Sequence, residues 1–132
     1  MMTEEEGPQP FSLSFRDGGY LHVEWAEGHT VTEQDARSLM DRVAQLSPSV
    51  RPPMLVHLNN MVSLSRPALQ AFATELKVSA LAIVGLTAVD RAITTFFTAV
   101  HEPNYPTQYF ESSAAAVQWL LSPPGLSGPS GQ

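Results

Sequence analysis

Cysteine is absent from the 132-residue chain, which excludes disulfides, thiolate metal sites and thiol catalysis. Basic residues are scarce, because 7 Lys and Arg stand against 13 Asp and Glu and leave a formal net charge of -6. The clustered cations of a nucleic-acid-binding surface are therefore missing. Long apolar runs are missing too, and the acidic start of the chain does not resemble a secretory signal. We expect a cytoplasmic protein with no membrane span and no nucleic-acid partner.

Apolar residues, by contrast, are plentiful: they make up 43% of a chain whose length suits one domain. Residues 1–10 hold three glutamates and two prolines, and residues 122–132 consist almost entirely of Ser, Pro and Gly. Neither composition buries enough apolar surface to offset the entropy of ordering. We expect a flexible N-terminal arm over residues 1–10, a single domain over residues 11–121 and a disordered tail over residues 122–132.

Five segments have the patterns of strands. Apolar and polar residues alternate over residues 11–15 and 20–25, on either side of a Gly-Gly turn, which predicts a β-hairpin. Residues 54–58 and 80–84 are nearly continuous apolar runs, as expected of strands covered on both faces. Residues 108–110 form a last short strand.

Four helices are predicted between and after these strands, because apolar residues recur there at helical spacing. The third helix extends to Val100. The residues that begin the helices are of the types that cap them: Thr32, Ser65, Thr87, and Ser112 or Ser113. The order ββαβαβαβα predicts an α/β fold with a mixed, mostly parallel five-stranded sheet, an N-terminal hairpin and about four helices.

Three stretches of the sequence carry a family resemblance: PMLVHLNNMVSLS at residues 53–65, ALAIVGLTAVDRAITTFF at residues 80–97 and YFESSAAAVQWLL at residues 109–121. In pattern and element order, residues 11–121 resemble the STAS superfamily, the fold of bacterial anti-sigma-factor antagonists. Within it, the chain resembles the uncharacterised SpoIIAA-like proteins, which are also compared with CRAL-TRIO lipid-binding domains. The resemblance implies a small bacterial domain that docks to another protein or holds a small ligand.

The same resemblance bears on phosphorylation. In the antagonists, the partner kinase phosphorylates a serine in an Asp-Ser-Ser-Gly-Leu-like segment after the central strand. Here Ser65 stands where that family tends to have aspartate, and Arg66 and Pro67 stand where its serines would be. We therefore expect that neither Ser63 nor Ser65 works as a phosphorylation switch, although a phosphate there would meet a helix N-terminus and Arg66.

Patterns for catalysis or metal binding are not found in the sequence. The four histidines, at positions 22, 29, 57 and 101, never have the spacing of two metal ligands on one helix face. His22 and Glu24 share one face of a strand, but two ligands do not make a site. His57 lies in a buried strand, where a hydrogen bond to a neighbour is a more common role than general base. We predict no catalytic residue, no metal site, no cofactor and no enzymatic activity.

Two arginines stand out, because Arg66 and Arg91 each lie in the first turn of a helix, where the dipole disfavours a cation. Both helices follow parallel strands, whose carboxyl ends are the usual place of a ligand site. Polar residues of the same loops complete a candidate binding site for an anion: Asn59, Asn60, Ser63, Ser65, Arg66, Thr87 and Arg91. In the alternative interpretation, Arg91 pairs with Asp90 or another carboxylate, and Arg66 is only solvated.

Two helices carry more apolar residues than one narrow stripe needs, at Phe96-Phe97 and at Trp119-Leu120-Leu121. This excess indicates either a wide core face or a surface that binds a partner or a second copy of the chain.

The sequence thus supports two functions and leaves both open. The first is a regulatory domain that binds a protein partner, a homodimer being one form of that partner. The second is a module for a small anionic ligand or a lipid, with an apolar pocket under the polar edge. A hydrolase has only Ser65, Asn59 and the arginines to draw on, with no general base placed beside them.

Overall fold

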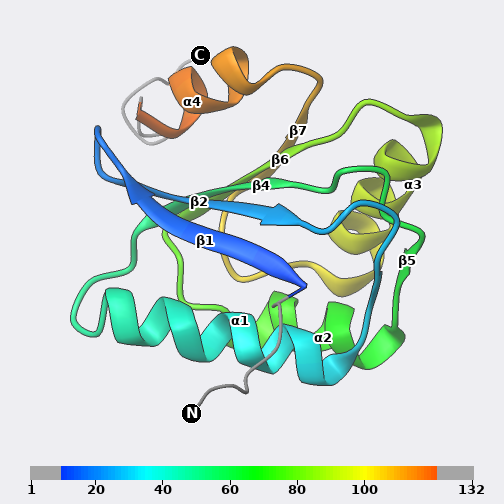
Figure 1. The fold of residues 1–132 in the computed structure, drawn as a ribbon, viewed down its shortest axis with the longest axis horizontal. Coiled ribbons are helices and arrows are strands. Elements are labelled where there is room, and N and C mark those ends of the chain that lie inside the picture. Colours follow the sequence, from blue (N-terminus) through cyan, green and yellow to red (C-terminus); the bar gives the residue numbers. More distant parts are fainter. Residues whose placement is uncertain (1–9, 122–132) are drawn as a thin grey trace, which may run out of the picture.

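Five strands form the central sheet of the computed structural model, which describes residues 10–121 (Figure 1). The strands are β1 (Phe11–Arg16), β2 (Tyr20–Trp25), β4 (Pro53–His57), β6 (Ala80–Val84) and β7 (Thr107–Phe110). They lie in the order β1-β2-β4-β6-β7, with β1 antiparallel to β2 and every other neighbouring pair parallel. The predicted mixed, mostly parallel sheet is confirmed. The predicted tail, and all but the last residue of the predicted arm, lie outside the described residues.

Four α-helices follow in the predicted places: α1 (Glu33–Leu46), α2 (Arg66–Glu75), α3 (Ala88–Phe96) and α4 (Ser113–Leu121). The predicted caps Thr32, Ser65, Thr87 and Ser112 each accept a hydrogen bond from a backbone N–H of the first turn, at 3.0 to 3.2 Å. These bonds satisfy donors that have no partner within the helix. Within residues 10–121, no helix is long and apolar enough to cross a membrane.

The helix predicted over residues 87–100 changes its geometry part-way. It leaves the α-helical form at Phe96, and a π-helical segment, η1 (Phe97–His101), follows. The hydroxyl of Thr98 donates to two carbonyl oxygens of the preceding turn, and side-chain bonds of this kind compete with the regular backbone ladder. The apolar period does not reveal such a change, because the π-helical segment is too short. Of the adjacent phenylalanines, Phe97 is buried and Phe96 is exposed.

A second, small sheet is not predicted by the sequence patterns. It pairs β3 (Thr30–Val31) with β5 (Ser63–Leu64) in parallel. Each strand has two residues, which is too short for an alternation to be recognised. Beside the pair, the N–H of Val62 donates to the carbonyl oxygen of His29 at 3.0 Å. The connection after β4 is therefore fastened to the segment that precedes α1.

Helices lie on both faces of the sheet (Figure 1), and the sheet separates two cores of unequal size. On one face, α1, α2 and η1 cover buried side chains of the strands, such as Leu21, Val23 and Met54. On the other face, α4 packs mainly on β4, β6 and β7, where it covers Leu55 and the small Ala82. β1 and β2 direct polar residues to that second face, where Ser12, Ser14, Arg16 and Glu24 are exposed and His22 is half-buried.

Candidate functional site

The connections that follow β4 and β6 lie at the same end of the sheet, because parallel strands end at one edge (Figure 1). We call residues 58–66 and 85–91 the carboxyl edge. In α/β sheets this edge is where ligands usually bind. All residues of the predicted binding site belong to it: Asn59, Asn60, Ser63, Ser65, Arg66, Thr87 and Arg91.

The hydroxyl groups of the carboxyl edge differ in what they contact. Ser65 and Thr87 cap α2 and α3, so each side-chain oxygen already accepts a bond from a first-turn N–H. Ser63 is exposed in β5, opposite Thr30 of β3. Two of the predicted site hydroxyls therefore stabilise helix starts, and Ser63 presents its hydroxyl to solvent.

Asn59 and Asn60 turn the chain at the end of β4. Both have left-handed backbone conformations, with φ values of 57° and 59°, which asparagine adopts more readily than most residues. The Nδ2 of Asn59 donates to the carbonyl oxygen of Trp25 at 3.0 Å, whereas Asn60 is exposed. Asn59 therefore fastens the turn to the end of β2, and Asn60 faces solvent.

The two arginines of the carboxyl edge have different surroundings. Arg91 forms an ion pair with Glu111, and its guanidinium carbon lies 4.9 Å from the centre of the Tyr109 ring. Arg66 is exposed and makes no ion pair within residues 10–121. Arg91 thus pairs with a carboxylate, as the alternative interpretation of the sequence predicts, and that carboxylate belongs to Glu111 rather than to Asp90. The preference for an anion stays a prediction that depends on Arg66, since Arg91 already has a carboxylate.

A polar cleft of about 250 Å³ opens at the carboxyl edge, on the side of the sheet that α4 covers. Its polar lining comes from β2, β4, the carboxyl edge, the connection between β7 and α4, and the start of α4: Glu24, His57, Asn59, Asn60, Asp90, Glu111 and Ser113. Neither Lys nor Arg lines it. Of the predicted site residues, this cleft brings together Asn59 and Asn60, and it surrounds them with three carboxylates.

His57 belongs to the wall of this cleft and is half-buried at the end of β4. Its Nε2 shares a hydrogen bond of 3.3 Å with the hydroxyl of Ser113, so the predicted bond to a neighbour is confirmed. The ring of His22 lies beside it, with 5.0 Å between the ring centres, and Arg16 donates from Nη2 to the Nδ1 of His22 at 3.2 Å.

Burial lowers the pKa of both imidazoles, His22 and His57. The positive charge of Arg16 lowers both further, whereas the carboxylate of Glu24 opposes the two shifts. Since the ordinary histidine pKa is 6.5, both rings are neutral at neutral pH. The cleft therefore contains carboxylates without a histidine cation to balance them.

The paired histidines predict a stability that depends on pH. Because the folded pKa values lie below the ordinary 6.5, the unfolded chain takes up more protons as the pH falls below that value. The free energy of unfolding should stay level above about pH 6.5 and fall below it, before carboxylates such as Asp35 titrate. Urea unfolding from about pH 8 to about pH 5 measures this fall. The double variant His22→Gln, His57→Gln should show a flatter profile, and an unchanged slope would contradict the assignment.

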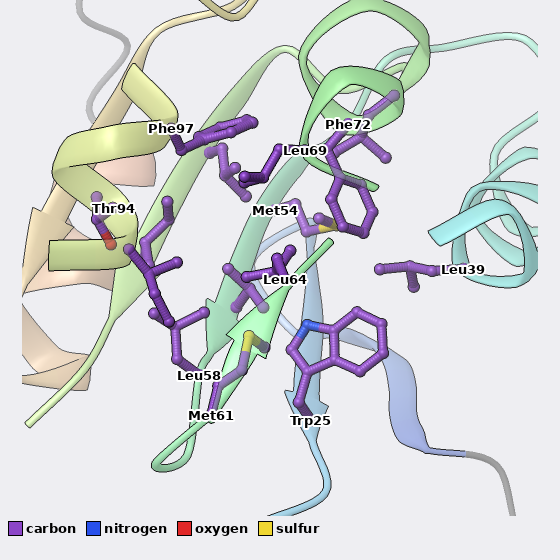
Figure 2. Close-up of a pocket in the computed structure, with 15 residues that line it drawn as sticks. Trp25, Leu39, Met54, Leu58, Met61, Leu64, Leu69, Phe72, Thr94 and Phe97 are labelled. Carbon is purple, nitrogen blue, oxygen red and sulfur yellow. The ribbon is translucent and has the colours of Figure 1, made fainter. Parts of the chain in front are cut away.

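An apolar cavity lies in the larger core, among side chains from the sheet, α1, α2, α3, η1 and β5 (Figure 2). Trp25, Met54 and Phe72 contribute to its lining, and Thr94 is the exception to its apolar character. Its volume is about 50 Å³, whereas pockets for small molecules have roughly 300 Å³ or more. The cavity has room for only a few atoms.

Aliphatic side chains are exposed on the carboxyl edge. Leu86 is 80% exposed, Val62 60% and Val89 53%. Leu86 also lines the polar cleft. Single exposed apolar residues are common on protein surfaces, whereas several at one end of a sheet, here on two connections and in the first turn of α3, are typical of an interaction surface. Phe96 of α3 and Val100 of η1 are exposed as well.

Comparisons with known proteins place this fold in a family. A family model described as a domain of unknown function, DUF7793, matches residues 13–122. The chain belongs to the DUF7793 family. The part of this DUF7793 domain that matches includes the carboxyl edge and the whole lining of the polar cleft. No curated protein matches the chain.

A solved structure similar to this DUF7793 domain shows its fold. An uncharacterised protein of the DUF3478 family from Shewanella loihica PV-4, described as having a SpoIIAA-like fold, matches with a TM-score of 0.61 at 15% identity, over 89% of this chain and 99% of that one. The predicted SpoIIAA-like fold is thereby confirmed. A protein of unknown function from Arthrobacter sp. FB24 is 34% identical over 83% of this chain and 97% of its own, with a TM-score of 0.35.

Proposed function

We propose that this DUF7793 domain is a cytoplasmic regulatory domain that binds a protein partner through its carboxyl edge and catalyses no reaction. The observation that carries the proposal is the exposure of Val62 and Leu86 on the loops of that edge and of Val89 in the first turn of α3. Burial against a partner would stabilise a complex by about 25 cal/mol per Å² of apolar surface. Polar neighbours such as Asn60 and Ser63 suit the rim of an interface. The resemblance to anti-sigma-factor antagonists, which dock to another protein, supports the same function.

The absence of catalysis is part of the proposal because of the way Ser113 and His57 are placed. They share a hydrogen bond, as a nucleophile and its base do. Glu24 lies opposite His57 in the strand register, but within residues 10–121 it makes no hydrogen bond to that imidazole. A nucleophilic serine is activated when a third side chain, usually a carboxylate, orients the histidine base. Glu24 does not orient His57 in this way, so we propose that Ser113 is not a nucleophile.

The alternative function, binding of a small ligand or lipid, rests on the apolar cavity. At about 50 Å³, the cavity would have to grow severalfold to enclose a ligand of ordinary size. Such growth would separate side chains that are now packed, among them Trp25 and Phe72. A surface that is already exposed needs no such change, which favours the protein partner.

Site-specific cross-linking tests the proposed function. A photo-crosslinking amino acid replaces Leu86 and, in a matched control, Val50, which is 69% exposed and precedes β4 at the opposite end of the sheet. In cells that naturally make the protein, we expect one dominant protein adduct from position 86 and none of that mass from position 50. No adduct at position 86, or the same adducts at both positions, would contradict the proposal. An adduct of twice the chain mass would identify a second copy as the partner.

Phosphorylation of Ser63 or Ser65 is not expected to control this binding. The Ser65 hydroxyl caps α2 through the N–H of Ala68 at 3.2 Å, a bond whose loss costs about 1 kcal/mol. Arg66 and Pro67 begin the helix in place of further hydroxyls. Intact-mass analysis of protein from its natural cells should show no stoichiometric phosphate. One phosphate per chain on Ser63 or Ser65 would contradict this prediction and would support a phosphorylation switch like that of the anti-sigma-factor antagonists.

A further inference from the structure

The floor of the polar cleft contains a carboxylate with an unsatisfied oxygen. Asp90 is 1% exposed and lines the cleft. Its Oδ2 accepts a hydrogen bond from the N–H of Leu86 at 3.2 Å. Its Oδ1 is buried and has no hydrogen-bond partner within residues 10–121. Leaving a buried acceptor unpaired is costly, and more so when it carries charge, so a donor that reaches this oxygen through the cleft would gain a favourable hydrogen bond.

The close packing of Asp90 on Gly85 fixes the position of this carboxylate. A Cβ at Gly85 would lie 2.5 Å from the Cβ of Asp90 and 3.1 Å from its Oδ2. Only a glycine at the end of β6 allows Asp90 to approach so closely. Two residues therefore determine where the carboxylate lies: Gly85, which follows β6, and Asp90 itself, in the first turn of α3.

Further negative charge surrounds this floor. Glu24 and Glu111 line the same cleft, and both are exposed. Arg91 pairs with Glu111 but does not itself line the cleft, and the His57 imidazole is neutral at neutral pH because burial lowers its pKa. Two of the three carboxylates that line the cleft, Asp90 and Glu24, therefore have no cationic partner within residues 10–121, and they attract a cation.

The size and form of the cleft decide which kind of cation fits. Within residues 10–121, no three His, Asp or Glu side chains are grouped closely enough to hold a metal ion. A volume of about 250 Å³ instead accommodates a charged group together with part of an alkyl chain. Leu86 lines the cleft and is 80% exposed, so it offers apolar surface to the methylene groups of that chain.

We infer that this cleft takes the ammonium or guanidinium group of a lysine or arginine side chain that the protein partner presents to the carboxyl edge. The inference rests on the proposed function and adds the chemistry of the partner's anchoring residue. The charged group donates toward Asp90 from above, with Glu24 and Glu111 on either side of it. The alkyl stem lies against Leu86, the exposed aliphatic side chain of the cleft lining.

Nuclear magnetic resonance with small probes tests the inference without the partner. Nα-acetyl-lysine methylamide should give saturable shifts of the amides of Gly85, Leu86 and Asp90 at low ionic strength, and the neutral norleucine analogue should not. The double variant Glu24→Gln, Asp90→Asn should weaken binding about tenfold, while its amides keep the dispersion of a folded domain. Asp90→Asn retains an oxygen that accepts the bond from Leu86.

The matched control removes the same charge elsewhere. Asp17 and Asp41 are exposed and do not line the cleft, so Asp17→Asn with Asp41→Asn should leave the binding of the lysine probe unchanged. Equal shifts with the norleucine analogue, no shifts with the lysine probe, or equal weakening in the control would overturn the inference.

The cross-link at position 86 separates this inference from the proposed function. If Glu24→Gln with Asp90→Asn lowers the yield of the partner adduct about tenfold, both stand. An adduct formed at full yield in that variant would leave a protein partner in place and refute its anchoring through a cation. The absence of any adduct in the wild type, with the lysine probe still bound, would refute the proposed partner and leave a site for alkylammonium groups.

Discussion

Replacing Gly85 by alanine should destabilise the domain by about 3 kcal/mol and lower its Tm by roughly 10 °C. The added Cβ would lie 2.5 Å from the Cβ of Asp90. Asp90 has no room to retreat, because it is buried and bonded to both Leu86 and Thr87. Relief requires the start of α3 to move away from the end of β6. Thermal unfolding followed by circular dichroism measures the loss.

Further variants separate this clash from the general cost of replacing a glycine. Gly28 has a φ of 68° but nothing within 4 Å of an added Cβ, so Gly28→Ala should cost only about 1 kcal/mol through backbone strain. Asp90→Gly removes the clashing Cβ, so Gly85→Ala should cost less in that background than in the wild type. Equal costs in both backgrounds would contradict the close packing of Asp90 on Gly85.

The second large effect concerns partner binding. With the cross-linker at Leu86, the double variant Val62→Gln, Val89→Gln should lower the affinity for the partner between about tenfold and a hundredfold. The reason is that two aliphatic side chains of the interface are lost, each worth about 1 kcal/mol or more. Adduct yield as a function of partner concentration measures the change. Stability should stay within about 0.5 kcal/mol of the wild type, since both valines are exposed.

The matched control for this variant removes exposed aliphatic side chains at the other end of the sheet. Leu46 and Val50 are 42% and 69% exposed, so Leu46→Gln with Val50→Gln makes a similar change of surface polarity. Its adduct yield from position 86 should equal that of the wild type. A loss of adduct yield in this control as large as in Val62→Gln, Val89→Gln would show that the partner does not bind specifically through the carboxyl edge.

The fold was predictable where local chemistry decides it. The helix caps Thr32, Ser65 and Thr87 depend on a hydroxyl three residues from the N–H it satisfies, which the sequence displays directly. The strands depend on runs of apolar residues that are visible in the same way. The pairing of β3 with β5 was not predictable, because two-residue strands take their place from the loops that bring them together.

The position of the candidate site in the fold was predictable from the sequence, but the charge of its cleft was not. Parallel strands put the predicted residues at one edge of the sheet, as expected. The charge of the cleft, however, comes from contacts across long sequence separations. Arg91 meets Glu111, twenty residues away, rather than its neighbour Asp90, and His57 meets Ser113, fifty-six residues away. A first-turn aspartate such as Asp90 suits a helix dipole in any protein, so nothing in the pattern indicates that its carboxylate forms the floor of a cleft.

Hydrogen exchange of the chain, alone and with its cross-linked partner, tests most directly whether the carboxyl edge is the docking surface. We predict slower exchange at the amides of residues 59–61 and 87, which lie outside the helices and strands, donate no hydrogen bond within residues 10–121 and exchange readily in the unbound chain. It also predicts unchanged exchange in the β1–β2 turn around Gly18 and in residues 47–52 before β4. Protection confined to those two turns, with the carboxyl edge exchanging as in the unbound chain, would contradict the account.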